Sequence, residues 1–255
     1  MIAHSPCSIN NLTLRYSGQS ANALEDITLD FRAGKMSAIV GPNGAGKSSL
    51  LKAALGLIKL QSGSVQFFGH DFKEVRKKIA YVPQRANVDW DFPIHVKEVV
   101  MQGLYSELKL SDIFTPKKHH EMAMQALEKV GLSEFANRQI SQLSGGQQQR
   151  MFLARALVQG MMEDGAELYI LDEPFAGVDA STEKIIVQIL KDLTKDNKSV
   201  IAVHHNLASV PEYFDDVTLI NRHLIAYGPV NDVFTENNIK KTYLPLSDIK
   251  KELSM

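Results

Sequence analysis

The stretch GPNGAGKS, residues 41–48, restricts the possible folds of this 255-residue chain more than any other stretch. It matches the pattern Gly-x-x-x-x-Gly-Lys-Ser/Thr, and it lies between the apolar run MSAIV (36–40) and the helix-forming run KSSLLKAALGLI (47–58). A strand that turns through glycines into a helix directs backbone N–H groups and the positive end of the helix at a phosphate. We therefore expect Lys47 to reach the β and γ phosphates of a nucleotide and the Ser48 hydroxyl to ligate Mg²⁺.

A second motif, LYILDE (168–173), ends an apolar strand on two carboxylates. Such a strand delivers Asp172 to the edge of a sheet, where it would hold Mg²⁺ through the ion's water shell, and Glu173 is placed to orient or deprotonate an attacking water. The alternatives are acids that only cap the next helix and, for residues 41–48, a glycine turn that only caps a helix. Because a chance match to the phosphate-loop pattern has odds on the order of 1 in 100, the two motifs together favour a nucleoside triphosphatase.

The residues on both sides of these motifs predict an α/β fold. Period-2 alternation in CSINNLTLRY (7–16) and LEDITLDF (24–31) predicts half-buried strands, and SGSVQFFG (62–69) reads as another strand between glycine turns. Further along, the apolar runs 168–171 and 199–203 flank an amphipathic helix. Strands that alternate with helices imply a mainly parallel sheet, with the N-terminal strands forming an antiparallel subdomain.

Between these strands, apolar spacings of three and four predict three helices: VKEVVMQGLYSEL (96–108), KKHHEMAMQALEKVGL (117–132) and GQQQRMFLARALVQG (146–160). The middle helix carries His119 and His120, which we expect to be solvated. We predict a single domain over 1–255. Its parts are a catalytic lobe (1–93 and 161–230), an inserted helical subdomain (94–160), and a C-terminal helix and tail (231–255).

Composition excludes several functions. The 28 basic and 29 acidic residues give a net charge of −1 with no basic block, so nucleic acid is not an expected partner. Cys7 is the only cysteine, which leaves no intrachain disulfide. The first residues lack the charged and apolar regions of a secretion signal, and the apolar runs are too short to span a bilayer, so we expect a soluble, cytoplasmic chain.

The run LSGGQQQR (143–150) indicates which kind of triphosphatase this is. Locally it predicts a helix start, with Ser144 as the N-cap and the first N–H groups available to an anion. A capped helix alone is the alternative. Together with the phosphate loop upstream and LDEP (171–174) downstream, the run closely resembles the signature of ATP-binding-cassette (ABC) ATPases.

The resemblance covers nearly the whole chain and implies roles for individual residues. It implies ATP binding by Tyr16, Gly41, Pro42, Asn43, Gly44, Ala45, Gly46, Lys47, Ser48 and Ser49. It implies contact with a second copy's ATP by Leu143, Ser144, Gly145, Gly146, Gln147 and Asp179. Tyr16 would stack on adenine, although such a residue taken alone could equally belong to a strand surface. The implied assembly is a head-to-tail dimer that ATP closes.

The resemblance also assigns the catalytic and Mg²⁺-binding groups. Gln84 corresponds to the coupling-loop glutamine, and His205 to the switch histidine that contacts the γ-phosphate. The implied catalytic set is Glu173, His205, Gln84 and Lys47, and the implied Mg²⁺ set is Ser48, Gln84 and Asp172. Adjacent residues on a strand point to opposite faces, so His204 and His205 are not expected to share a ligand. The family usually has aspartate where this chain has Asn206.

The segment YVPQRANVDWDF (81–92) resembles the ATP-binding subunits of bacterial manganese, zinc or iron importers, in which a Val-Asp-Trp-Asp-Phe-Pro run follows the coupling glutamine. In these ATPases the segment receives a membrane subunit, so Asp89, Trp90, Asp91 and Phe92 become candidate permease contacts. Trp90 half-buried under a loop with solvated acids is the alternative. A calcium loop is disfavoured, because Ile94 stands where it needs glycine and Val100 where it needs glutamate.

We therefore predict the ATP-hydrolysing subunit of a transition-metal importer, with manganese the first candidate and zinc or iron the others. Its expected partners are a second copy, an integral-membrane permease and, indirectly, an extracytoplasmic metal-binding protein. Its expected location is the cytoplasmic face of the membrane. A soluble ABC ATPase of an assembly system, such as iron–sulfur cluster scaffolding, is the alternative.

Overall fold

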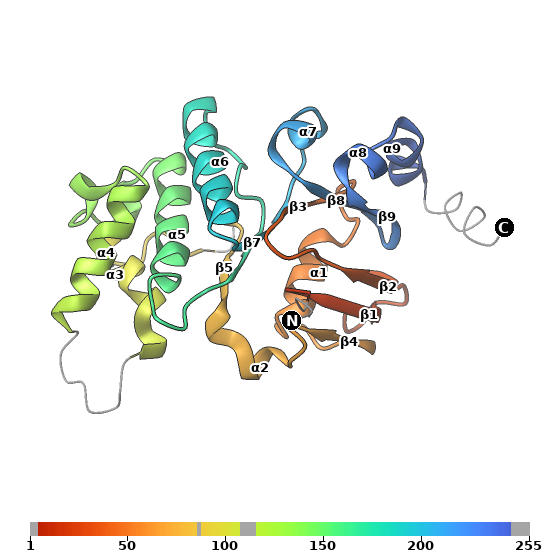
Figure 1. Ribbon diagram of the computed structural model, residues 1–255, viewed down its shortest axis with the longest axis horizontal. Helices are drawn as coiled ribbons and strands as arrows, with labels where there is room; N and C mark the ends of the chain where they lie inside the picture. The colour runs from red at the N-terminus through yellow and green to blue at the C-terminus, as the bar shows by residue number, and fades with distance from the viewer. Residues whose placement is uncertain (1–4, 86–87, 108–115, 246–255) are drawn as a thin grey trace. The chain divides into compact units, whose positions relative to one another are not determined.

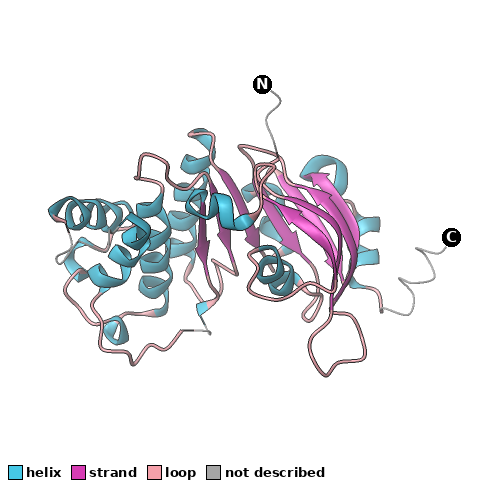
Figure 2. Cartoon of the chain, turned by 90° about the horizontal axis from the view of Figure 1, so that it is seen from below, coloured by secondary structure: helices cyan, strands magenta, loops and turns pink. Residues whose placement is uncertain are grey.

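The computed structural model describes residues 5–85, 88–107 and 116–245, and the chain divides into two compact units (Figure 1). The first unit comprises residues 1–76 and 201–255, and the second comprises residues 77–200. Strand β7 (Ser199–Val203) crosses the second of these boundaries. Figure 2 shows the helices and strands of the chain, and both units contain elements of each kind, as expected for an α/β protein.

The first unit contains two sets of strands. Its elements are β1 (Ser8–Leu14), β2 (Leu24–Asp30), β3 (Met36–Val40), α1 (Lys47–Ala54), β4 (Ser62–Gln66), α2 (Phe72–Val75), α7 (Val210–Tyr213), β8 (Asp216–Asn221), β9 (His223–Pro229), α8 (Val230–Val233) and α9 (Glu236–Tyr243). Strand β1 lies between β2 and β4 in an antiparallel sheet, with Ile9 opposite both Leu29 and Val65. Strand β3 pairs in parallel with β8, and β8 pairs antiparallel with β9.

Burial along these strands follows their sequence patterns. In β2, burial alternates with the predicted period of two from Ile27 to Asp30, and Leu24 is also buried, three residues before Ile27, where the register with β1 shifts. All five residues of β3 are buried, as expected for an apolar run covered on both faces. The expected strands at 7–16, 24–31, 36–40 and 62–69 are therefore confirmed, the one at 36–40 with the same bounds and the other three with narrower ones.

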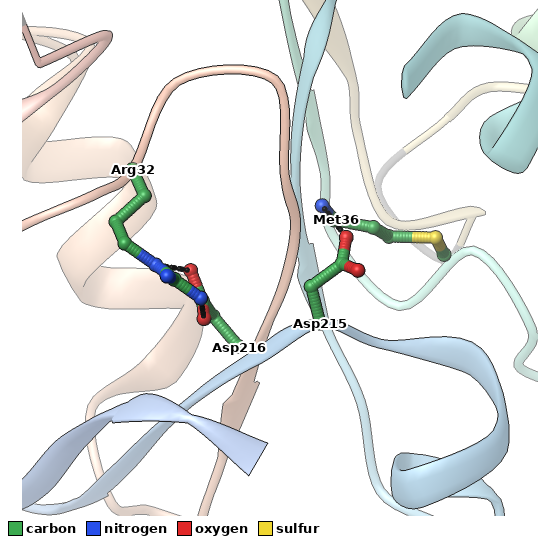
Figure 3. Close-up of polar contacts among 4 residues, drawn as sticks. All are labelled: Arg32, Met36, Asp215 and Asp216. Carbon is green, nitrogen blue, oxygen red and sulfur yellow. Dashed lines mark hydrogen bonds and ion pairs between the residues drawn. The ribbon is translucent and has the colours of Figure 1, made fainter. Parts of the chain in front are cut away.

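An arginine–carboxylate pair joins the end of β2 to the start of β8 (Figure 3). The Arg32 guanidinium donates to both carboxylate oxygens of Asp216, with Nε 2.8 Å from Oδ2. This hydrogen bond, with the charge of Asp216, raises the pKa of Arg32. The adjacent Asp215 accepts a hydrogen bond from the Met36 N–H at 2.9 Å, at the start of β3 (Figure 3). Asp216 thus ties the end of β2 to β8, and Asp215 anchors the start of β3, the strand that leads into the phosphate loop.

The second unit is helix-rich. Its elements are β5 (Ile79–Val82), α3 (Val96–Met101), α4 (Lys117–Lys129), α5 (Gly145–Gln159), β6 (Leu168–Leu171), α6 (Ala180–Lys195), and 3₁₀ turns at Gln102–Glu107, Ser133–Phe135 and Ile140–Gln142. Strands β5 and β6 pair in parallel, with Val82 opposite Leu171. Helices α3, α4 and α5 pack against one another (Figure 1). The parallel pairs in both units and the antiparallel sheet confirm the predicted α/β fold class.

The helices differ from their predictions in two places. The first predicted helix is α-helical only over Val96–Met101, continues as a 3₁₀ turn to Glu107, and its predicted last residue, Leu108, lies outside the described residues. The expectation that His119 is solvated is wrong: its side chain is buried on the inner face of α4, whereas His120 is partly exposed. The apolar spacing of Met122, Ala123 and Ala126 places His119 on that same buried face.

The C-terminal region contains α8 and α9, and Asn221 fastens α9 to β8. The Asn221 side-chain amide donates to the carbonyl oxygens of Thr242 at 2.9 Å and Leu244 at 3.2 Å. The helix expected after residue 230 is present as α8 and α9. The tail beyond residue 245 lies outside the described residues. The compact units divide at 76/77 and 200/201, whereas the predicted subdomains divide at 93/94 and 160/161, so the functional subdivision of the domain stays a prediction.

No helix in the described part of the chain is both long enough and apolar enough to cross a membrane.

Candidate functional site

The phosphate loop in the first unit has the shape that its glycines require. Helix α1 begins at Lys47, and Gly46 caps it with φ at 94°, a conformation that side chains other than glycine rarely adopt. A Cβ on Gly46 would also lie 2.5 Å from Leu24 Cδ2. At the start of the loop, a Cβ on Gly41 would lie 2.0 Å from the carbonyl oxygen of Ile220, so β8 approaches too closely for any larger residue.

Lys47 lies inside this loop. Its side chain is buried, and its Nζ donates to the carbonyl oxygens of Gly41 at 2.9 Å and Pro42 at 2.8 Å. The ammonium group is therefore held among the backbone groups of the loop itself. Asn43 and Gly44 are exposed at the tip of the loop, and Ala45 is buried beneath it.

Tyr16 follows β1 and reaches the start of α1. Its hydroxyl forms a hydrogen bond with Ser49 Oγ at 2.9 Å, and its side chain is 36% exposed. Tyr16 also lines an open hollow of about 550 Å³ formed by residues 15–19 and 58–61. The predicted adenine-stacking residue thus has an exposed ring, and its hydroxyl is anchored beside the phosphate loop.

The two adjacent histidines after β7 point to opposite sides, as expected. His204 is buried, whereas His205 is exposed. The His204 Nε2 forms a hydrogen bond with Ser209 Oγ at 2.8 Å, and the ring packs against Phe214 with a centroid distance of 5.1 Å. Burial lowers the pKa of His204 to about 4, so its imidazole is neutral near neutral pH.

His204 and Asn206 fix the turn that carries His205. The His204 N–H donates to the carbonyl of Ile39 on β3 at 3.0 Å, two residues before Gly41. The Asn206 carbonyl accepts from Ser209 Oγ at 3.1 Å, and its side-chain Oδ1 accepts from the Ala208 N–H at 3.1 Å. Asn206 caps the 3₁₀ turn Leu207–Ser209 with its amide oxygen, a bond that an aspartate at this position would make with a carboxylate.

In the second unit, Asp172 and Glu173 follow β6 directly. Asp172 is completely buried, and Glu173 adopts the left-handed backbone conformation with φ at 56°. Such a conformation is uncommon for a non-glycine residue and persists where the surrounding structure enforces it, often at functional sites. The Gln84 amide Nε2 donates to Glu173 Oε2 at 2.8 Å, so the structure brings these two predicted catalytic residues together.

The signature run begins helix α5 as predicted. Ser144 Oγ accepts from the Gln147 N–H at 3.3 Å, and Gln147 Oε1 accepts from the Ser144 N–H at 2.8 Å, a reciprocal capping box. This confirms Ser144 as the N-cap. The Leu143 side chain is buried, so a contact with a ligand would have to come from its backbone.

Asp179 caps helix α6. Its carboxylate accepts hydrogen bonds from the Ser181 hydroxyl and N–H and from the Thr182 N–H and hydroxyl. These bonds, that of the Ser181 hydroxyl first, hold the pKa of Asp179 well below its ordinary value. The sequence did not indicate this capping role, although Ser-Thr after an aspartate is a helix-start pattern.

The acidic segment 88–93 exposes its side chains unequally. Trp90 is half-buried: its Nε1–H donates to the Arg85 carbonyl at 3.2 Å, and its ring meets Phe152 of α5 edge to face at 5.4 Å. Asp89, Asp91 and Phe92 are exposed, Phe92 by 57%. Among the described residues, no three histidine, cysteine or acidic side chains are grouped so as to hold a metal ion.

The site residues therefore fall into two sets. Tyr16, the phosphate loop and His205 belong to the first unit, and Gln84, Asp172, Glu173, the signature run and Asp179 belong to the second. Sequence reasoning did not single out Arg85, whose only signal is its place directly after Gln84. The first unit has a glycine loop that leads into a helix whose first residue is the buried Lys47. The second has a strand that ends on two carboxylates, one of them hydrogen-bonded to Gln84. These features define the class of phosphate-loop nucleoside triphosphatases.

Comparisons with known proteins narrow this class. The profile of the ABC transporter family matches residues 24–176. The chain is 48% identical over 239 residues to the manganese transport system ATP-binding protein MntB of Bacillus subtilis, covering 93% of this chain and 92% of that protein. It is 50% identical over 236 residues to the zinc transport system ATP-binding protein TroB of Treponema pallidum, covering 92% and 85%. The chain belongs to the ABC transporter family, and it is an ATP-hydrolysing cassette of that family.

A solved structure gives the same result for the fold. A dimeric ATP-binding cassette in a post-hydrolysis state, bound to ADP and Pi, matches with a TM-score of 0.74 and 27% identity, covering 88% of this chain and 98% of that one.

Proposed function

We propose that this chain is the ATP-binding and ATP-hydrolysing subunit of an importer of transition-metal ions, with manganese the first candidate and zinc or iron the others. The observation that carries the proposal is the 48–50% identity, over more than nine-tenths of the chain, to ATP-binding proteins of manganese and zinc transport systems. Both relatives belong to transport systems, and neither favours the alternative of a soluble assembly ATPase.

In this proposal the phosphate loop and Tyr16 bind ATP. The exposed Tyr16 ring stacks on adenine, and the N–H groups of residues 41–49 surround the phosphates. The two loop carbonyls that hold Lys47 Nζ are uncharged, and a phosphate oxygen offers this ammonium a stronger, charge-assisted hydrogen bond. His205, on the exposed side of its turn, contacts the γ-phosphate.

Glu173 is the residue that orients and deprotonates the attacking water. Its backbone conformation and its hydrogen bond with Gln84 hold the carboxylate in one position. The same bond makes Gln84 the connection between the catalytic carboxylate and the segment 88–93, which lies a few residues further along the chain.

The donor set fits Mg²⁺. A serine hydroxyl (Ser48), an amide oxygen (Gln84) and a buried carboxylate (Asp172) are all oxygen ligands, the kind that Mg²⁺ prefers in nucleotide sites. Gln84 uses its amide nitrogen for Glu173, so its amide oxygen is the atom suited to the ion. When bound, Mg²⁺ would neutralise charge on the β and γ phosphates.

Two copies act together in the proposal. Residues 143–147 and Asp179 of one copy face the ATP held by the phosphate loop of the other, so a single copy has half of each site. Shifting a dimer from about 1:99 to about 99:1 in favour of closure requires ~5.5 kcal/mol of differential binding. Two nucleotides that share this demand supply under about 3 kcal/mol each, which a few charge-assisted hydrogen bonds can provide.

The membrane partner is an integral permease at the cytoplasmic face, with an extracytoplasmic metal-binding protein beyond it. Asp89, Asp91 and the 57%-exposed Phe92 are the proposed contacts. Trp90 supports them from beneath, because its ring packs on Phe152. An apolar ring flanked by exposed charges suits a groove in a protein partner.

Purification of the chain from its native membranes tests the function. We expect a multi-helix membrane protein to accompany it, and cells that lack the chain to lose manganese, zinc or iron. Co-purification with a soluble complex alone, with unchanged cellular metals, would contradict the proposal.

A further inference from the structure

Arg85 connects segments that the proposed function treats separately. Its backbone carbonyl accepts hydrogen bonds from the Trp90 indole N–H at 3.2 Å and from the Val88 N–H at 3.3 Å. Two donors on one carbonyl fix the position of Arg85 relative to the segment 88–93. Trp90 is thus linked directly to the backbone of Arg85.

The side chain of Arg85 ends at the signature helix. A Cβ built on Gly145, the first residue of α5, would lie 2.0 Å from Arg85 Nη1 and 3.1 Å from its Cζ. The guanidinium thus occupies the space that any larger residue at position 145 would need. The same Nη1 lies 3.9 Å from the Cβ position of Gly177, in the loop that leads to Asp179. One guanidinium group therefore lies beside both segments predicted to face the partner's ATP.

Gly146, the second glycine of the signature run, is packed against Thr182 of α6. A Cβ on Gly146 would lie 3.0 Å from Thr182 Oγ1, and that hydroxyl donates to Asp179 Oδ2 at 3.0 Å. Arg85 on one side and Thr182 on the other therefore pack against the two glycines. The starts of α5 and α6 are set against each other by these contacts.

The Arg85 guanidinium lies beside the start of a helix. A helix N-terminus carries partial positive charge, so a guanidinium beside Gly145 meets a field of its own sign. No carboxylate of the described residues forms an ion pair with Arg85. A phosphate brought to the same place would meet the charge of the guanidinium together with that of the helix start.

We propose that Arg85 is a positioning residue of the nucleotide site formed in trans: it holds the start of α5 and the Gly177 loop in register and ties both to Trp90. This inference rests on the proposed ATP-dependent dimer. It predicts that Arg85 acts on the half-site that receives the partner's ATP and leaves the phosphate loop of its own unit unaffected.

Arg85→Ala and Arg85→Lys, made in the Glu173→Gln background, test the inference. We expect Arg85→Ala to weaken ATP-dependent dimer formation about tenfold or more by analytical ultracentrifugation, while the affinity of the monomer for a fluorescent ATP analogue is unchanged. Arg85→Lys should restore part of the loss. Arg138→Ala is the matched control, because Arg138 is an exposed arginine of the same unit that stacks on Phe135.

Hydrogen exchange on the nucleotide-free chain provides a second measurement that does not depend on dimer formation. Arg85→Ala should speed amide exchange at residues 144–148 and 176–180 and nowhere else, and Arg138→Ala should not. Unchanged exchange in both segments would overturn the inference. Equal dimer formation with and without Arg85 would overturn it too, whereas a Glu173→Gln chain that never dimerises with ATP would overturn the proposed function instead.

Discussion

At the scale of single residues, the environment of His204 sets its behaviour. Its ring is buried against Phe214, bonded to Ser209, and has a pKa lowered to about 4, below the ordinary 6.5. Between pH 6.5 and about pH 4, His204 is therefore protonated in the unfolded chain and neutral in the folded chain. Stability contributed by the neutral imidazole is complete above pH 6.5 and is lost as the pH falls through this window.

We predict that His204→Asn reduces the loss of stability between pH 7.5 and pH 5. Urea unfolding at the two pH values measures the effect, and the comparison is between the pH-dependent losses and not between absolute stabilities. His120→Asn is the control, since His120 is partly exposed on α4. Equal losses in the parent and in His204→Asn would show that another group carries the acid sensitivity.

Residue identity alone indicated the chemistry of the site but not its geometry. The residue types at positions 47, 172 and 173 indicated phosphate binding by an ammonium group and Mg²⁺ or water binding by carboxylates, because few residue types carry these charged groups. The left-handed backbone of Glu173 was not readable, because it depends on segments that pack from elsewhere in the chain. The burial of His119 was readable from the apolar spacing of α4 but was not predicted.

At the scale of elements, the pair Arg32–Asp216 connects β2 with β8 (Figure 3). Arg32 is half-exposed, whereas the Asp216 carboxylate is 9% exposed, so loss of the arginine leaves a nearly buried charge without its bidentate partner. We predict that Arg32→Gln lowers the free energy of unfolding by about 1 kcal/mol, a value limited by the exposure of Arg32.

Thermal unfolding of Arg32→Gln, Asp216→Asn and the double variant tests this prediction. The double variant should be more stable than the sum of the two single losses implies, because neither charge is then stranded. Arg76→Gln, an exposed arginine of the same unit, is the control. Strict additivity of the two losses would contradict a direct interaction.

The existence of most elements followed from local pattern. The strands near 24–31 and 36–40 and the helices α4, α5 and α6 were predicted because apolar periodicity is a property of neighbouring residues. The end of α3 at Met101 was missed: its apolar spacing continues to Tyr105, but the structure changes to a 3₁₀ turn at Gln102. Gly103, whose Cβ position lies 2.4 Å from the Arg155 carbonyl oxygen, marks the close approach of α5 there.

At the scale of the whole molecule, Glu173 tests the proposed cycle. We predict that Glu173→Gln binds ATP, loses turnover by at least about 100-fold, as expected for removal of a general base, and accumulates as a dimer with ATP but not with ADP. Glutamine keeps an oxygen for the Gln84 amide, so the local structure should persist. Phosphate release and light scattering measure the two effects.

Glu134→Gln is the control for that experiment, because Glu134 is exposed in a 3₁₀ turn of the same unit. Normal turnover in Glu173→Gln would remove Glu173 from its assigned role. A loss of turnover without a dimer would retain the catalytic assignment and remove the ATP-driven closure.

By itself the sequence determined the phosphate loop and the capped signature helix, because each depends on residues that are adjacent in the chain. It also indicated the family, because several such local motifs occur in one order along the chain. Only the tertiary structure decided the rest. Gly41 must be glycine because the Ile220 carbonyl lies against it, and Trp90 turns inward because Phe152 offers it a face. Arg85 lies against Gly145, which is 60 residues away in the chain. Contacts of this kind depend on how the elements pack, and no local sequence pattern encodes them.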